Sequence, residues 1–185
     1  MPGGRADGDA STPRRPLVLV GLMGSGKTTV GRALAADLRW AFVDNDELLR
    51  QVTGRTAAEL AARDGADVLH RREAETLLAE LDRHDPVVIA AAASVVLDPD
   101  VRRELPRRAD VVWLQASDAA LRERLADRGS RPDLGGEPRD VVSAQRVERS
   151  AWYSQVAACV VDTTGRPAEA VVQAVRAFLR RREHR

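Results

Sequence analysis

Cysteine is nearly absent from this 185-residue sequence, which contains only Cys159. A single cysteine cannot form an internal disulfide, and this composition is typical of cytoplasmic proteins. Long apolar runs are also missing, because no stretch approaches the ~20 residues that span a bilayer. Residues 1–15 contain no apolar core of the kind that a secretory signal needs. We therefore predict a cytoplasmic protein without membrane contact, in which residues 1–15 form a flexible tail.

Neither sign of charge is in excess, since the formal net charge is +1. Nothing in this balance indicates a nucleic-acid partner. The three histidines, His70, His84 and His184, lack the spacing of metal ligands, so no zinc site is expected. A chain of 185 residues that is 44% hydrophobic can bury one core. We predict a single domain over residues 16–182, present as a monomer.

Short apolar runs alternate with helical patterns along the chain. Continuous apolar runs of this kind, separated by helices, predict an α/β fold with a parallel sheet covered by helices on both faces. Ligands of such sheets bind beyond the carboxyl ends of the strands. The expected strands are 17–20, 41–43, 87–90, 111–114 and 158–161, and the expected helices are 28–38, 47–52, 57–63, 68–81, 99–105, 118–126, 141–156 and 168–180.

Residues 21–28, Gly-Leu-Met-Gly-Ser-Gly-Lys-Thr, match the phosphate-binding pattern G-x-x-x-x-G-K-[ST] in full. The motif follows a predicted strand and opens a predicted helix, which is the setting that phosphate binding requires. The glycines let successive N–H groups face one anion, Lys27 reaches the β- and γ-phosphates, and Thr28 ligates magnesium. The alternative is a glycine-rich turn with a lysine placed by chance. The full spacing favours a P-loop that binds ATP with Mg²⁺.

Asp44 and Asp46 follow the second predicted strand. Alternate residues of an extended segment point the same way, so both carboxylates are expected to face the phosphates. One would hold magnesium while the other accepts a proton from a hydroxyl nucleophile. The alternative is structural, with Asp46 capping a helix that begins at Glu47. The phosphate loop upstream favours the functional interpretation.

The segment 128–139 is rich in arginine, glycine and proline and includes Arg131. Phosphoryl transfer needs positive charge on the migrating group and exclusion of water, which an arginine loop provides when it closes. This segment is therefore expected to be a lid, and a solvated charged loop is the alternative.

Taken together, the motifs resemble the shikimate kinases, small members of the nucleoside-monophosphate-kinase-like P-loop fold. The resemblance covers nearly all of residues 17–172. It implies a small-molecule kinase of aromatic amino acid biosynthesis and a five-stranded parallel sheet in the order 2-3-1-4-5. The matching pieces are residues 21–32 and 42–46, Thr53-Gly54-Arg55, Glu73, Arg131-Pro132, Arg149 with Tyr153, and Val161-Asp162-Thr163.

The resemblance implies a role for each matching position. Asp46 resembles the aspartate that contacts the acceptor hydroxyls and serves as base, and Asp44 the one near magnesium, which it holds with Thr28. Arg131 resembles the lid arginine, so Lys27, Asp46 and Arg131 are the expected catalytic residues. Arg149 resembles an arginine that clamps the acceptor carboxylate. Arg124 corresponds to the arginine stacked on adenine, and the implied nucleotide-binding residues are Gly24, Ser25, Gly26, Lys27, Thr28, Thr29, Arg124 and Pro167.

Two departures from the family pattern lie on the acceptor side. His70 stands where the family has a second carboxylate-binding arginine, in a Phe-Arg-x-x-Glu segment, and an imidazole is mostly neutral at pH 7. Ala92, Ala93 and Ser94 stand where the family has three glycines. Side chains there would crowd the acceptor, and any position with positive φ would be strained. The expected acceptor-binding residues are Asp46, His70, Ala92, Ala93, Ser94 and Arg149.

Three hypotheses follow from an intact nucleotide side and an altered acceptor side. The first is a kinase that phosphorylates shikimate to shikimate 3-phosphate in a tolerant pocket. The second is a kinase for another small hydroxylated acceptor, such as a cyclitol or sugar acid. The third is an ATP-binding paralogue with little catalytic activity. Asp46, Arg131 and Arg149 are retained, which favours the two kinase hypotheses.

Overall fold

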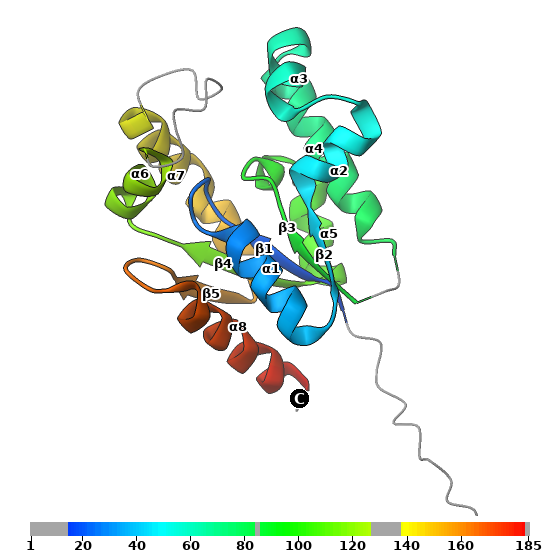
Figure 1. Ribbon diagram of the computed structural model, residues 1–185. Helices are drawn as coiled ribbons and strands as arrows, with labels where there is room; N and C mark the ends of the chain where they lie inside the picture. Colours follow the sequence, from blue (N-terminus) through cyan, green and yellow to red (C-terminus); the bar gives the residue numbers. More distant parts are fainter. Residues whose placement is uncertain (1–14, 84–85, 127–137, 184–185) are drawn as a thin grey trace, which may run out of the picture.

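The computed structural model describes residues 15–83, 86–126 and 138–183. Most of the predicted tail and of the predicted lid, with Arg131, therefore lies outside the described residues. Five strands form one parallel sheet in the order β2-β3-β1-β4-β5, which confirms the implied order (Figure 1). The strands are β1 (Leu17–Val20), β2 (Ala41–Asp44), β3 (Val87–Ala90), β4 (Asp110–Gln115) and β5 (Cys159–Asp162).

Helices cover both faces of the sheet, as predicted, and successive residues of β1 explain why. Leu17 and Leu19 face one apolar cluster, whereas Val18 and Val20 face the other. Full burial of such side chains stabilises the fold by ~1.5–3 kcal/mol each. The first cluster lies under α1 (Lys27–Leu38) and α8 (Ala168–Glu183), and the second under α4 (Ala66–Glu80), α5 (Pro99–Arg108), α6 (Asp118–Ala126) and α7 (Pro138–Val156).

Side-chain caps fix where two of the helices begin. Asp98 caps α5, and its carboxylate accepts hydrogen bonds from the N–H groups of Asp100 and Val101 at 2.8 and 3.0 Å. Thr56 and Glu59 form a capping box at the start of α3 (Ala57–Asp64), in which each side chain bonds the other's backbone. The position of α3 matters because this helix borders the site described below.

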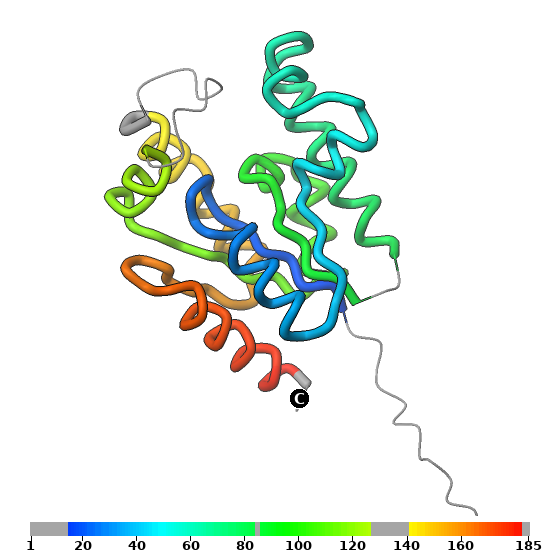
Figure 2. The backbone as a smooth tube through the Cα atoms, in the orientation of Figure 1, coloured from blue at the N-terminus to red at the C-terminus, as the bar shows by residue number. Residues whose placement is uncertain are grey.

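Because the strands are parallel, their carboxyl ends meet at one edge of the sheet. The segment after β1, Asp44 at the end of β2, residues 91–94 after β3, and Thr163 after β5 all lie at this edge. The chain from α2 (Asn45–Thr53) through α3 projects beyond the same edge before α4 returns to the sheet (Figure 2). Within the described ranges, no helix is long and apolar enough to cross a bilayer.

Candidate active site

The segment between β1 and α1 has the backbone of a phosphate-binding loop. Gly21 has φ of 143°, and a Cβ there would lie 2.4 Å from the Leu114 carbonyl oxygen, so only glycine fits. Gly26, with φ of 96°, precedes α1 and supplies no side-chain cap, and the first turn contains no acidic residue. The N–H groups at the start of α1 are therefore available to bind an anion, and the helix dipole favours it.

Lys27, the only lysine in the sequence, lies at the first position of α1. Its Nζ donates to the carbonyl oxygens of Gly21 and Leu22, at 2.8 and 3.1 Å. The side chain thus folds back over the loop to which phosphates would bind. An ammonium on four methylenes can turn from these carbonyls to a phosphate without a change in the backbone.

Thr28 and Asp44 bring two oxygen atoms together from different elements. The Thr28 hydroxyl donates to Asp44 Oδ2 at 2.9 Å. Among the described residues, no group of three or more histidine, cysteine or carboxylate side chains could hold a metal by itself. Two oxygen ligands nevertheless fit Mg²⁺, which keeps several waters and binds through few protein groups together with substrate phosphates. These atoms therefore suit the predicted magnesium site.

The expectation that Asp44 and Asp46 share one face of an extended segment is wrong. Only Asp44 is extended, and α2 begins at Asn45, two residues earlier than predicted. The reason is that Asp44 itself caps the helix, because its Oδ1 accepts the Asp46 N–H at 3.1 Å. The alternative in which Asp46 is the cap is wrong for the same reason. Both carboxylates still line one cavity, since the first helical turn carries Asp46 toward it.

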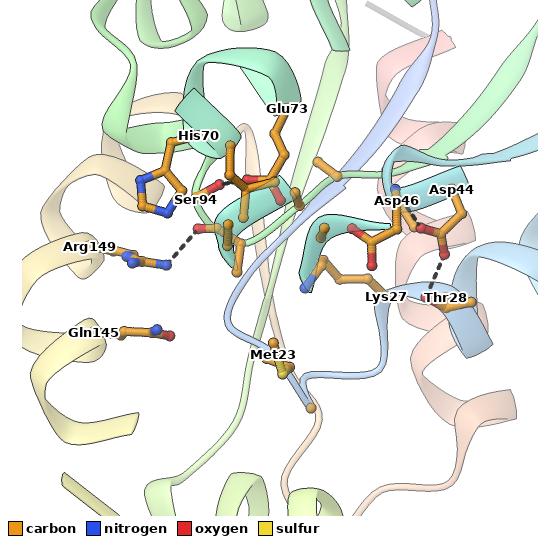
Figure 3. A pocket seen from close by; sticks show the side chains of 18 of the residues that line it. Met23, Lys27, Thr28, Asp44, Asp46, His70, Glu73, Ser94, Gln145 and Arg149 are labelled. Atoms are coloured by element: carbon orange, nitrogen blue, oxygen red, sulfur yellow. Dashed lines mark hydrogen bonds between the residues drawn. The ribbon is translucent and has the colours of Figure 1, made fainter. Parts of the chain in front are cut away.

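A cavity of about 240 Å³ connects the phosphate loop to α4 and α7 (Figure 3). Lys27, Thr28, Asp44 and Asp46 lie on one side, and His70, Ser94 and Arg149 lie opposite. Between them the wall is apolar. Apart from Leu69 it consists of alanines from α3, the start of α4, the end of β3 and the segment that follows: Ala57, Ala58, Ala61, Ala66, Ala90, Ala91, Ala92 and Ala93.

Arg149 supplies a buried cation to the acceptor side of the cavity, with 7% of its surface exposed. Its Nε donates to the Glu148 carboxylate at 3.1 Å and its Nη1 donates to the Ala93 carbonyl at 3.3 Å. The Tyr153 hydroxyl donates to the same carbonyl at 2.6 Å. A guanidinium has five N–H groups, so these two bonds leave Arg149 able to bind a carboxylate in the cavity.

Glu73 of α4 faces Ser94, and the two side chains are hydrogen-bonded. Glu73 is buried, with 5% of its surface exposed, and burial is the largest cause that raises its pKa to about 7. The neighbouring Asp46 carboxylate also raises this pKa, whereas Ser94, Arg149 and Lys27 oppose the rise. Near neutral pH this carboxyl is therefore divided between its protonated and charged forms.

The two departures have different structural consequences. Burial and the nearby Arg149 guanidinium lower the pKa of His70, so the imidazole is neutral at pH 7, as predicted. The predicted backbone strain at 92–94 is wrong. Ser94 has φ of −86°, and among the described residues Arg39 is the only non-glycine with positive φ. An ordinary backbone carries Ala92, Ala93 and Ser94 along the cavity wall.

The residues predicted for the nucleotide base lie beside the phosphate loop. Arg124 of α6 donates to the Gly24 carbonyl at 3.2 Å and to the Thr163 carbonyl at 2.7 Å, which ties the loop to the end of β5. Pro167 is exposed just before α8. Ser25 is buried and Thr29 is exposed, and neither lines the cavity. Nucleotide binding by these residues stays a prediction, as does the role of Arg131.

Two polar residues that line the cavity, Glu73 and Gln145, had no role predicted from the sequence. The sequence does contain a signal for Glu73, because it lies four residues from both Leu69 and Leu77. A carboxylate at this spacing lies on the apolar face of α4, where an unpaired charge is costly. Gln145 of α7 has no comparable signal.

Comparisons with known proteins agree with this geometry. The family profile described as shikimate kinase matches residues 23–180. A shikimate kinase of Symbiobacterium thermophilum is 39% identical over 172 residues, 91% of this chain and 98% of that protein, and one of Mycobacterium avium is 40% identical over 157 residues, 84% and 88%. A solved shikimate kinase of Acinetobacter baumannii in complex with shikimate superposes with a TM-score of 0.84 at 28% identity, covering 90% of this chain and 93% of that one.

The fold, the phosphate loop and the adjoining cavity define a P-loop kinase that acts on small molecules. Within that class, the profile match and the relatives place the chain plainly: it belongs to the shikimate kinase family.

Proposed function

We propose that this protein transfers the γ-phosphoryl group of ATP to a hydroxyl of shikimate, with Mg²⁺ bound to the nucleotide. The observation that carries the proposal is that Lys27, Thr28, Asp46 and Arg149 all line one cavity. A carboxylate held by Arg149 and a hydroxyl directed at Asp46 would fix both ends of one small acceptor beside the phosphates. We include a cytoplasmic location and a monomeric state in the proposal.

The chemistry follows from where the described residues lie. The N–H groups of the loop and Lys27 bind the β- and γ-phosphates, while Asp46 accepts the proton of the acceptor hydroxyl. The acceptor oxygen then bonds to the γ-phosphorus, the bond from that phosphorus to the bridging oxygen breaks, and ADP leaves. Thr28 and Asp44 would hold Mg²⁺, which supplies positive charge to the phosphate oxygens. Arg131, which lies outside the described residues, would complete this charge from the lid.

One observation favours an acceptor other than shikimate, namely the side chains that line the acceptor side of the cavity. His70 is neutral there, and the hydroxyl of Ser94 reaches a position where the family pattern has glycine. A carboxylated ring with a different hydroxyl pattern, such as another cyclitol or sugar acid, would meet the same Arg149 and Asp46. An inactive ATP-binding paralogue is less well supported, because Asp46, Lys27 and Arg149 line one cavity.

The test of the proposed function is an assay of acceptor-dependent ADP release. We expect turnover with shikimate and Mg²⁺-ATP, and less with a panel of cyclitols and sugar acids at equal concentration. Phosphorylated product identified by mass spectrometry separates transfer from simple ATP hydrolysis. Turnover with another acceptor alone would select the second candidate, and no turnover with any acceptor, despite ATP binding in calorimetry, would contradict both.

The Arg149→Lys change should separate acceptor binding from nucleotide binding. Lysine keeps the positive charge but loses the planar pair of donors that matches a carboxylate. We expect the KM for shikimate to rise by about tenfold or more while the KM for ATP changes little. Steady-state kinetics with each substrate varied in turn measures both quantities.

Arg71→Ala is the matched control for this experiment. Arg71 is exposed on α4 and does not line the cavity, so its loss should leave the KM for shikimate unchanged. If Arg71→Ala raised this KM and Arg149→Lys did not, Arg71 would be the residue that binds the acceptor.

A further inference from the structure

The contact between Glu73 and Ser94 joins two elements of the acceptor wall. Glu73 belongs to α4 and Ser94 to the segment after β3, and they are 21 positions apart in the sequence. Both residues are buried, with 5% and 6% of their surfaces exposed. Both also line the cavity, so this hydrogen bond lies in the wall that an acceptor would touch (Figure 3).

A buried carboxylate needs a partner, and few groups are placed to provide one. Asp46 from α2 repels the Glu73 carboxylate, while Lys27 from α1 and Arg149 from α7 attract it from across the cavity. Arg149 is already engaged with Glu148 and with the Ala93 carbonyl. Ser94 is the neighbour whose hydroxyl donates a hydrogen bond to the carboxylate, and losing such a bond leaves a buried charge poorly satisfied.

The two departures from the family pattern both concern this carboxylate. A residue at position 70 lies three positions before Glu73 on α4, and residues with this spacing are neighbours on a helix surface. An arginine at position 70, as in the family pattern, could therefore pair with Glu73. In this chain that position is the neutral His70, so the carboxylate lacks the cation. The added hydroxyl of Ser94 donates a hydrogen bond to the same carboxylate.

We infer that Ser94 is the positioning residue for Glu73 in the acceptor site, and that its hydroxyl compensates for the arginine that His70 replaces. The expected effect of Ser94 on acceptor binding rests on the proposed function. Its expected effect on Glu73 rests only on the hydrogen bond between the two side chains. Ser94 fixes the Glu73 carboxylate against the segment after β3. The guanidinium of Arg149 then remains directed at the acceptor instead of at Glu73.

A cycle of single and double changes tests this assignment. Ser94→Ala removes the hydroxyl without changing the backbone, and His70→Arg restores the cation. We expect Ser94→Ala to raise the KM for shikimate about tenfold with a much smaller change in kcat. The reason is that the Glu73 carboxylate is no longer held in place, while the groups that take part in phosphoryl transfer are unchanged. In the double variant, the KM should return to within about threefold of the unchanged protein. His70→Arg alone should have a smaller effect than it has in the Ser94→Ala background.

Ser143→Ala is the matched control, because Ser143 also bonds a carboxylate, that of Asp118, at 3.3 Å outside the cavity. This variant should leave the KM for shikimate unchanged. Equal effects of His70→Arg with and without Ser94 would overturn the compensation. An unchanged KM in Ser94→Ala, at an unchanged melting temperature, would overturn the positioning role.

A second readout does not depend on activity or on the identity of the acceptor. The pKa of Glu73 is raised from 4.5 to about 7, so the folded protein binds its proton more tightly and stability falls as pH rises through that interval. The groups that face this carboxyl are Asp46, Lys27, Arg149 and Ser94, from four different elements. The Ser94 hydrogen bond lowers this pKa, so Ser94→Ala should extend the fall in stability to higher pH, and His70→Arg should reverse it.

Melting temperature against pH measures this effect, and Glu73→Gln, which has no titrating carboxyl, should remove it. If the protein did not phosphorylate shikimate, the proposed function would be wrong. The pH dependence of the melting temperature would still test whether Ser94 positions Glu73. If the Ser94→Ala and unchanged proteins had the same pH dependence, the positioning role would fail whatever the acceptor is.

Discussion

Replacing Lys27 by alanine is expected to lower kcat by about 10²–10³-fold, the usual loss when one preorganised group is removed from the developing charge of a transition state. The physical reason is that Lys27 is the cation nearest the phosphate loop on the cavity wall, at the first position of α1. No other side chain of the loop carries a positive charge. Affinity for ATP should fall as well, which isothermal titration calorimetry measures beside the steady-state rate.

Two further variants make the Lys27 experiment specific. Arg32→Ala removes one positive charge from an exposed position of the same helix, where the guanidinium lies over the Phe42 ring, and it should leave the rate unchanged. Lys27→Arg keeps the charge but replaces the compact ammonium with a rigid plane, and it should not restore activity. A Lys27→Ala protein that bound ATP normally would show that the loop does not hold the triphosphate.

The Asp46→Asn change is expected to lower kcat by about 10²–10⁴-fold, the range that a positioned general base contributes. Asparagine is nearly isosteric with aspartate and keeps the α2 backbone. The loss of the Asp46 carboxylate should therefore affect proton acceptance and not the fold. The carboxylate lines the cavity on the same side as Lys27, which is where the acceptor hydroxyl must approach (Figure 3). Single-turnover measurements with saturating ATP and shikimate isolate the chemical step from binding.

Glu47→Gln is the neighbouring control for Asp46. Glu47 is exposed in the same turn of α2, bonds Arg50 at 2.7 and 2.9 Å, and does not line the cavity. Its loss should leave kcat unchanged. If the Asp46→Asn protein retained most of its activity, the base assignment would be wrong, and Glu73, the other carboxyl of the acceptor side, would be the next residue to change.

The sheet could be predicted from the sequence because its strands are short continuous apolar runs with no competing interpretation. Leu17–Val20 and Val87–Ala90 are strands at the predicted bounds, since both of their faces are buried. The phosphate loop was equally clear, because Gly21, Gly24 and Gly26 all have a positive φ, which side chains disfavour, and at Gly21 a Cβ would also clash with the Leu114 carbonyl. The order of the strands could not be predicted from the apolar pattern of the sequence. It was implied by the resemblance to the shikimate kinases.

The acceptor side could be predicted only in part, because it depends on contacts between distant segments. The alternation rule placed Asp44 and Asp46 on one extended face, but capping by Asp44 brought the helix start forward. The bond between Glu73 and Ser94 joins residues that no local pattern relates. The strain expected at Ser94 did not arise, since substitution of a family glycine does not itself require a positive φ.

The placement of Lys27 also allows nucleotide binding to be followed by chemical labelling of a single side chain. All other basic side chains besides histidine are guanidinium groups, which do not react with reagents that acylate primary amines under mild conditions. Such a reagent has one side-chain target, located in the cavity wall, besides the amine at the start of the chain. Protection of that single target by a nucleotide would therefore report occupancy of the phosphate loop directly, as a mass change confined to one peptide.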